Sequence, residues 1–186
     1  GFYGEQTLDL ANRIKALGGT LDYLAVDGGL RSGLGSCNWT PRQSAENAAQ
    51  NIAMLRTVFP SVKVGDIESP PLTPDQSTQL AVWLDAWQAA TGEPLAILHA
   101  DDSSSPIPAL DAMRQIAEQR QIPFGIIYDG LGSDASDRDW VDHARGHYES
   151  IETAGNVIPD HVVFQSWHHY PKHVLPESDP TTFTHL

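Results

Sequence analysis

Apolar positions along the chain alternate between two spacings. Five short runs rich in Val, Ile, Leu, Tyr and Phe are typical of buried strands, and between them apolar residues recur every three or four positions, as on one helix face. The predicted strands are 21–27, 62–68, 95–101, 124–129 and 161–167. The predicted helices are 6–17, 41–59, 74–91, 109–121 and 138–154, and residues 28–38 are predicted to form a Gly/Ser-rich loop.

Three helix boundaries carry sequence signals of their own. Thr40 and Thr73 each precede a proline, and a hydroxyl residue followed by proline is typical of a helix N-terminus. Gly92 follows the third predicted helix, where glycine commonly ends a helix in a left-handed conformation. These signals make the second and third helices the most sharply bounded elements of the prediction.

Strands that alternate with helices at a spacing of roughly 30 to 40 residues predict βαβ units and an all-parallel sheet. We expect a single α/β domain over residues 1–186, built as part of a (β/α)8 barrel; an open doubly wound sheet fits the same pattern. Because the sequence has neither an initial methionine nor a clear final helix stop, we expect it to be a piece of a longer parent or a processed product. No glycine-rich phosphate loop follows any predicted strand.

Charge and composition exclude several classes of partner. The 186 residues carry a formal net charge of −13, which repels nucleic acid, and no apolar run approaches the roughly 20 residues that cross a bilayer. A single cysteine, Cys37, rules out an intramolecular disulfide and a thiol-based zinc site. The sequence leaves the cellular location open and favours a secreted or periplasmic one.

Chemically active side chains gather where the predicted strands end. Four strands finish on an acid and the fifth on tryptophan; these residues are Asp27, Glu68 (with Asp66 two positions earlier), Asp101, Asp129 and Trp167. Parallel α/β folds bind ligands at the carboxyl ends of their strands. The pattern therefore predicts a site at that end of the sheet.

The alternation of side chains along a strand sharpens this expectation. Residues two positions apart share a face, so Asp66 shares its face with Glu68, His99 with Asp101, and Gln165 with Trp167. If Leu24 and Val26 face the helices, Tyr23, Ala25 and Asp27 point the other way. We expect the acids, the imidazole and the indole to converge on one mouth.

Structural explanations stand beside the functional ones. Asp27 could cap the turn at Gly28, and Asp129 followed by glycine is also typical of a turn. His99 could orient a neighbouring acid. Trp83, Trp87 and Trp140 lie on predicted helix stripes and are expected in the core.

The final strand carries a resemblance to a known group of enzymes. Residues 162–167, followed by Tyr170-Pro171 and residues 175–177, resemble the last strand and loop of retaining (β/α)8-barrel glycoside hydrolases, which place a tryptophan there under the sugar. The resemblance makes the five strands numbers four to eight of the barrel. The Asn-Glu and glutamate motifs of that clan are missing at Asp27-Gly28 and Tyr128-Asp129, so the parent family would be divergent.

Glycoside hydrolysis needs two carboxyl groups, and this sequence offers several. Glu68 is the expected general acid, because burial beside Asp66 would raise its pKa, and Asp27, Asp101 or Asp129 would be the second carboxylate. Trp167 would stack on a sugar ring. The other expected substrate contacts are His99, Tyr128, Gln165 and His168.

Two other functions remain open. One is a sugar-isomerase-like barrel that binds magnesium or manganese through Asp27, Glu68, His99 and Asp101. Glycoside hydrolysis, in contrast, requires no cofactor. A catalytically silent carbohydrate-binding barrel is the third possibility. In every case we expect an oligo- or polysaccharide ligand, no nucleic acid, no membrane, and self-association through exposed sheet edges.

Overall fold

The computed structural model describes residues 4–101 and 103–185. In that part of the chain, five parallel strands form one sheet and alternate with helices, which confirms the α/β prediction. The strands are β1 (Tyr23–Asp27), β2 (Lys63–Glu68), β3 (Ile97–Ala100), β4 (Phe124–Tyr128) and β5 (His161–Phe164).

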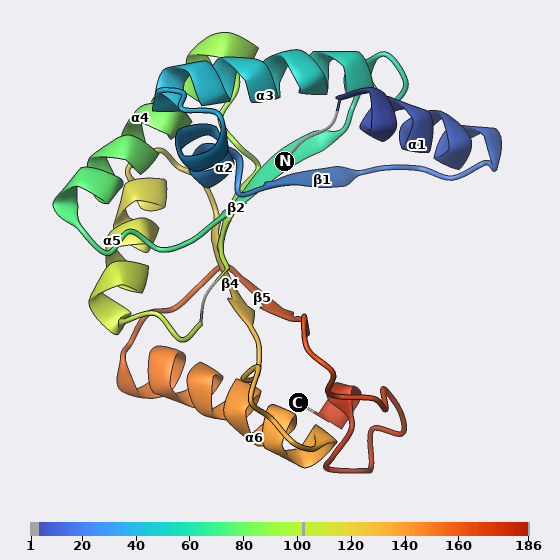
Figure 1. Cartoon of the computed structure of the whole chain (residues 1–186), viewed down its shortest axis with the longest axis vertical. Coiled ribbons are helices and arrows are strands. Elements are labelled where there is room, and N and C mark those ends of the chain that lie inside the picture. The colour runs from blue at the N-terminus through green and yellow to red at the C-terminus, as the bar shows by residue number, and fades with distance from the viewer. Residues whose placement is uncertain (1–3, 102, 186) are drawn as a thin grey trace.

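The strands lie in the sheet in the order in which they occur in the sequence, β1-β2-β3-β4-β5, and every neighbouring pair is parallel. A doubly wound sheet reverses this order at a switch point, whereas an arc of a (β/α)8 barrel does not. Figure 1 shows the helices from α2 to α6 following the outer side of a curved sheet, with an opening between β1 and β5. The sequential order fits the partial barrel.

The helices cover most of the predicted ranges. They are α1 (Gly4–Ala16), α2 (Gly29–Ser36), α3 (Pro41–Arg56), α4 (Pro74–Thr91), α5 (Ile107–Glu118), α6 (Asp137–Tyr148), the π-helical turn η1 (Glu149–Ala154) and the short 3-10 turn η2 (Phe183–His185). The α6 and η1 segments together occupy the last predicted helix.

The prediction of a loop over residues 28–38 is wrong, because α2 occupies most of it. Glycine disfavours helix by about 1 kcal/mol per residue, and the glycines of this segment masked its helical character. Leu30 and Leu34 are nevertheless spaced one helical turn apart, and both pack against the core.

The expected helix caps are confirmed. The Thr40 hydroxyl accepts a bond from the Gln43 amide at 3.3 Å, and the Gln43 side chain accepts one from the Thr40 amide at 2.9 Å. Thr73 and Gln76 form the same reciprocal pair at the start of α4. Gly92 ends α4 with φ of 81°, a left-handed conformation that glycine adopts without strain.

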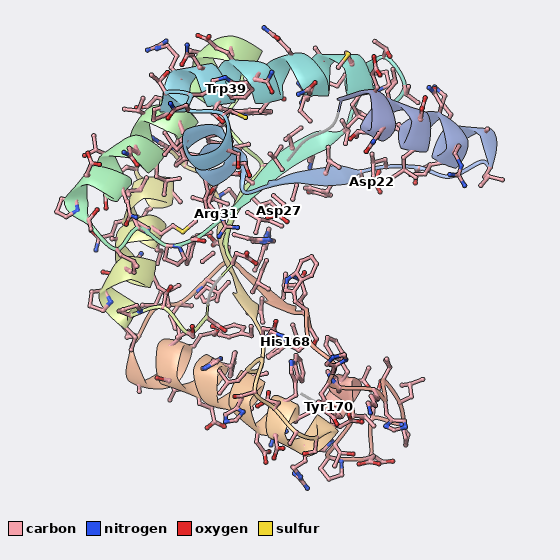
Figure 2. The ribbon with its side chains drawn as sticks, viewed as in Figure 1. Asp22, Asp27, Arg31, Trp39, His168 and Tyr170 are labelled. Atoms are coloured by element: carbon pink, nitrogen blue, oxygen red, sulfur yellow. The ribbon has the colours of Figure 1, made fainter. Side chains whose placement is uncertain are left out.

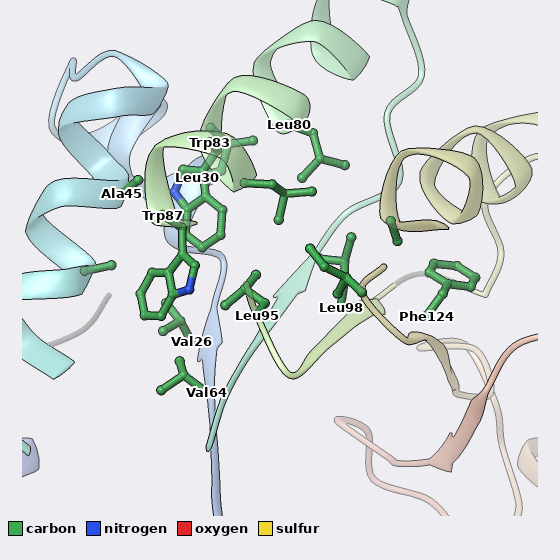
Figure 3. Packing of buried hydrophobic residues seen from close by; sticks show 14 of the residues in the cluster. Val26, Leu30, Ala45, Val64, Leu80, Trp83, Trp87, Leu95, Leu98 and Phe124 are labelled. Atoms are coloured by element: carbon green, nitrogen blue, oxygen red, sulfur yellow. The ribbon is translucent and has the colours of Figure 1, made fainter. Parts of the chain in front are cut away.

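The main core lies between the sheet and the outer helices, as Figure 3 shows for part of it. Trp83 and Trp87 of α4 are fully buried and stacked with their ring centroids 6.0 Å apart. Trp140 of α6 is also fully buried and stacks on Phe183. All three tryptophans are core residues, as predicted, and none is a ligand platform. No helix among the described residues is both long and apolar enough to span a bilayer.

The last strand is shorter than predicted. Its ladder with β4 ends at the pair Tyr128 and Phe164, so Gln165 and Trp167 lie beyond the regular strand. Strand alternation therefore does not apply to those two residues, and the prediction that they share a strand face is wrong.

Candidate functional site

Strand register divides the predicted site residues between the two faces of the sheet. Val26 is paired with Asp66, and Asp66 with Leu98; residues paired in a parallel ladder point to the same side. Val26 and Leu98 are buried under the helices, so Asp66 faces the helices, and so does Glu68 two residues later. Asp27 is paired with Ile67 and faces the open, concave side.

The predicted convergence on one mouth is therefore wrong for the two acids of β2. His99 is paired with Ile67 and joins Asp27 on the concave side, as Figure 2 shows for Asp27. The expected inward direction of Tyr23 and Asp27 agrees with their exposure. The metal set that combined Glu68 with Asp27, His99 and Asp101 is not assembled on one face.

Glu68 binds the N-terminus of α2. Its Oε1 atom accepts a bond from the Leu30 amide at 2.5 Å, and Oε2 accepts one from the Arg31 amide at 3.4 Å. The first amides of a helix have no partner within the helix and carry partial positive charge, so a carboxylate stabilises them. The side chain thereby attaches α2 to the end of β2.

Burial sets the proton affinity of this carboxyl group. Loss of hydration raises the pKa of Glu68 to about 7, and the charge of Asp27 adds to the effect. The amides of Leu30 and Arg31 and the guanidinium of Arg31 act in the opposite direction. Glu68 consequently exchanges a proton close to neutral pH, as the sequence analysis expected from its burial.

Asp66 lies deeper than Glu68. It is fully buried, and neither carboxyl oxygen has a hydrogen-bond partner among the described residues. Burial, followed by the charge of Glu68, raises the pKa of Asp66 well above its usual value. An unpaired buried carboxylate is strongly unfavourable, so burial favours the protonated form of Asp66.

A cavity of about 120 Å³ adjoins Glu68 between α2 and the segment that leads from β2 into α4. Its walls combine apolar side chains with hydrogen-bonding groups; the polar residues on them are Arg31, Ser69, Gln76 and Gln79. The guanidinium of Arg31 donates to the Ser69 hydroxyl at 2.9 Å, so these two lining residues contact each other. A small polar group could approach Glu68 from solvent through this cavity.

A larger cavity, of about 260 Å³, lies between α2 and α3. Cys37 and Trp39 contribute to its wall. Cys37 is an exposed, free cysteine directly after α2.

Asp129, directly after β4, organises the segment that follows β5. Its Oδ1 atom accepts bonds from the Gly130 amide at 2.8 Å and from the Trp140 indole at 2.7 Å. Its Oδ2 atom accepts a bond from the Trp167 amide at 3.3 Å and lies 3.7 Å from Nε2 of His168. The bond to Gly130 agrees with the turn role weighed for Asp129.

Trp167 is anchored through its backbone while its side chain is 70% exposed. His168 follows it on the concave side (Figure 2). Gln165 donates its amide to the Tyr128 carbonyl at 3.0 Å, which extends the β4–β5 contact by one bond. An exposed indole on a backbone anchored in this way is a suitable surface for stacking on an apolar ligand face.

Tyr128 is not placed to contact a ligand on the concave side. It is paired with Phe164, is fully buried, and donates its hydroxyl to Glu152 at 2.9 Å. Burial and the bond to Glu152 raise the pKa of Tyr128. The prediction of Tyr128 as a substrate contact is corrected, because the residue packs under α6 and η1 with Tyr148.

His99 lies on the concave side above Gly125. Its ring is edge-to-face with His161, with centroids 5.9 Å apart. Burial lowers the pKa of His99, and His161 lowers it further. A Cβ on Gly125 would lie 2.1 Å from Cδ2 of His99, so only glycine leaves room for this ring. His99 is half of a histidine pair, and it is not shown orienting an acid.

The sequence analysis did not single out His161 or Gly125. Their meeting depends on register, which pairs Gly125 with both His99 and His161. Among the described residues, no three His, Cys, Asp or Glu side chains lie close enough together to hold a metal ion. The signal available in the sequence was a glycine inside an otherwise apolar strand, which is typical of a close approach.

Comparison with known proteins gives no assignment. No family model matches the chain, and no curated protein is significantly similar to it.

Proposed function

We propose that the carboxyl end of this sheet binds carbohydrate and cleaves a glycosidic bond. Glu68 would be the general acid, Asp27 the second carboxyl group, and Trp167 a stacking surface for a sugar ring. The observation that carries the proposal is the placement of Glu68 and Asp27 at the ends of neighbouring strands, one buried and one exposed. Acid–base catalysis by a carboxyl pair needs two carboxyl groups in different environments and close to one bond. Asp27 and Glu68 point to opposite faces of the sheet, but they lie near enough for the charge of Asp27 to raise the pKa of Glu68.

The surroundings of Glu68 support an acid role. Its pKa of about 7 lets it hold a proton at neutral pH and release one during reaction. The cavity beside it carries amide and guanidinium groups that can bind sugar hydroxyls.

Trp167 supports the carbohydrate part of the proposal. Large aromatic side chains are normally buried, and this one is exposed although its backbone is fixed by Asp129. Asp129 would act as a positioning residue, because both of its oxygens already contact groups that hold the segment after β5.

The test is hydrolysis of a panel of aryl glycosides and oligosaccharides by the wild-type chain and by Glu68→Gln. Loss of a general acid typically lowers the rate by about 10²- to 10⁴-fold. Asp22→Asn is the matched control, since Asp22 is an exposed acid just before β1 and lies away from the strand ends. Unchanged turnover in Glu68→Gln, or an equal loss in the control, refutes the assignment.

A carbohydrate-binding protein without catalysis is the second candidate. It is favoured by the use of both Glu68 oxygens in bonds to α2. Binding without hydrolysis would be seen as sugar-dependent quenching of tryptophan fluorescence in a wild-type chain that releases no product. Trp167→Ala would remove the quenching, whereas the buried Trp83, Trp87 and Trp140 would give a constant background.

A further inference from the structure

Two histidines on the concave side of the sheet meet above the middle of β4. Gly125 is paired with His99 of β3 on one side and with His161 of β5 on the other. The three residues therefore point to the same face, and the two imidazoles lean together over the glycine. Their ring centroids are 5.9 Å apart and their planes are inclined by 76°.

One of these imidazoles has a nitrogen that lacks a partner. His99 is 8% exposed, and its Nε2 atom has no hydrogen-bond partner among the described residues. Leaving a buried polar atom unpaired typically costs about 1–3 kcal/mol, so such an atom requires an explanation.

The ring of His99 fills the space that the missing Cβ of Gly125 leaves. A Cβ at that position would lie 2.5 Å from Nε2 of His99 and 3.1 Å from Cβ of His161. The ring therefore extends from β3 across β4, toward the strand that carries His161. His161 is exposed, so the pair has one imidazole in contact with solvent and one buried.

We propose that His99 and His161 bind one divalent transition-metal ion, with water in the remaining coordination positions. A Zn–N bond of about 2.0–2.1 Å puts a ring centroid about 3.2 Å from the ion, so two imidazoles at a tetrahedral angle have centroids about 5 Å apart. The observed separation of 5.9 Å is close to this value. Imidazole ligands select zinc, nickel or copper over magnesium and calcium.

This site is separate from the carboxyl pair assigned to glycoside hydrolysis. Gly125 is the second residue of β4, whereas Asp27 and Glu68 end their strands, and Glu68 faces the helices. Metal binding at this site can therefore be tested independently of the proposed hydrolysis. An ion with two protein ligands keeps exchangeable positions, which suits binding of a small oxygen-containing ligand from the concave side.

The experiment is calorimetric titration of the metal-free full chain with Zn²⁺ alone, followed by Co²⁺ absorption spectra that report nitrogen coordination. His161→Ala is the test variant, because His161 is exposed and its loss leaves the core intact. His143→Ala is the matched control: His143 is also exposed, and it lies 2.6 Å from Asp134, so it tests binding by an ordinary surface His–Asp pair.

We expect one zinc ion to bind to the wild type and to His143→Ala with equal affinity. His161→Ala should weaken it by roughly tenfold or more, since even loss of a residue behind a metal ligand costs about 10- to 100-fold. Absence of zinc binding, equal binding by His161→Ala, or loss of binding in His143→Ala overturns the proposal.

Nuclear magnetic resonance of the wild-type chain provides a second readout without any substitution. Addition of Zn²⁺ should move the imidazole nitrogen signals of His99 and His161 together, at one equivalent. Movement confined to other histidines would place the ion elsewhere and also refute the site.

Discussion

At the scale of single residues, burial decides how the acids of β2 behave. Asp66 and Glu68 are separated from solvent by the helices, and each has a pKa above its usual value because of that burial. Asp27, one strand away, is exposed on the opposite face. The same residue type thus has different chemistry on the two faces of one sheet.

Glu68 is expected to make stability depend on pH. Its pKa rises from 4.5 to about 7 on folding, so the folded chain binds the proton more tightly than the unfolded chain. This contribution is complete below about pH 4.5 and is lost as the pH rises to about 7, by an amount on the order of 3 kcal/mol. Denaturant unfolding at pH 5 and pH 8 should show a smaller decrease for Glu68→Gln than for the wild type.

The control for that measurement is Glu46→Gln, which changes an exposed glutamate on α3 and should retain the wild-type dependence. Asp66 acts with the same sign, and the charge of Glu68 contributes to its raised pKa, so Glu68→Gln reports the effect of the two carboxyl groups together. A wild-type decrease that persists unchanged in Glu68→Gln would contradict the buried-acid interpretation.

Gly125 is expected to be intolerant of a side chain. In Gly125→Ala the new Cβ would overlap the His99 ring, and we expect a loss of about 1–3 kcal/mol in the free energy of unfolding. Gly146→Ala in α6 is the control, because its Cβ meets nothing within 4 Å and alanine favours helix. If His99→Ala does not relieve the defect in the double variant, the assumed overlap is wrong.

At the scale of elements, the sequence predicted what local chemistry determines. Thr40 and Thr73 identified helix starts, and the tryptophans of the helix stripes were assigned correctly to the core. The α2 helix was missed because its glycines weaken the helical signal and because Glu68, almost forty residues later, binds its N-terminus. Strand register could not be predicted from the sequence either. The alternation of side chains shows which residues share a face of a strand, but not which face the helices cover.

The glycines of α2 allow a paired test of this helix. Gly35 has open space at its Cβ position, so Gly35→Ala should stabilise the chain by up to about 1 kcal/mol through helix propensity. Gly33 lies against α3, where a Cβ would approach the Ser44 hydroxyl oxygen to 2.3 Å, so Gly33→Ala should destabilise. Thermal unfolding of both variants checks the pair, and effects of the same sign would contradict the packing.

At the scale of the whole molecule, the curved sheet has two edges. β1 and β5 each pair with one neighbour only in the described chain, and Tyr23 and Val162 on them are about half exposed. Unpaired parallel edges favour association with another strand. We therefore expect self-association that increases with protein concentration, as originally anticipated from a partial barrel.

A charge on an edge strand should reduce that association. Val162→Lys places an ammonium group on β5 and should lower the average mass measured by light scattering at high concentration. Val174→Lys is the control, since Val174 is also exposed but lies outside the sheet, and it should have no effect. A wild-type chain that remains monomeric at every concentration would refute the edge interpretation.

The sequential order of the strands also shapes how the chain acquires its structure. Every strand hydrogen-bonds only to the strands that precede and follow it, so each βα unit needs its neighbours in the sequence and no distant segment. Each pairing closes one βα unit of roughly 30 to 40 residues, which loses less chain entropy than pairing strands further apart in the sequence. Folding can therefore begin within a central unit and extend outward in both directions, much as it does along a solenoid of repeats.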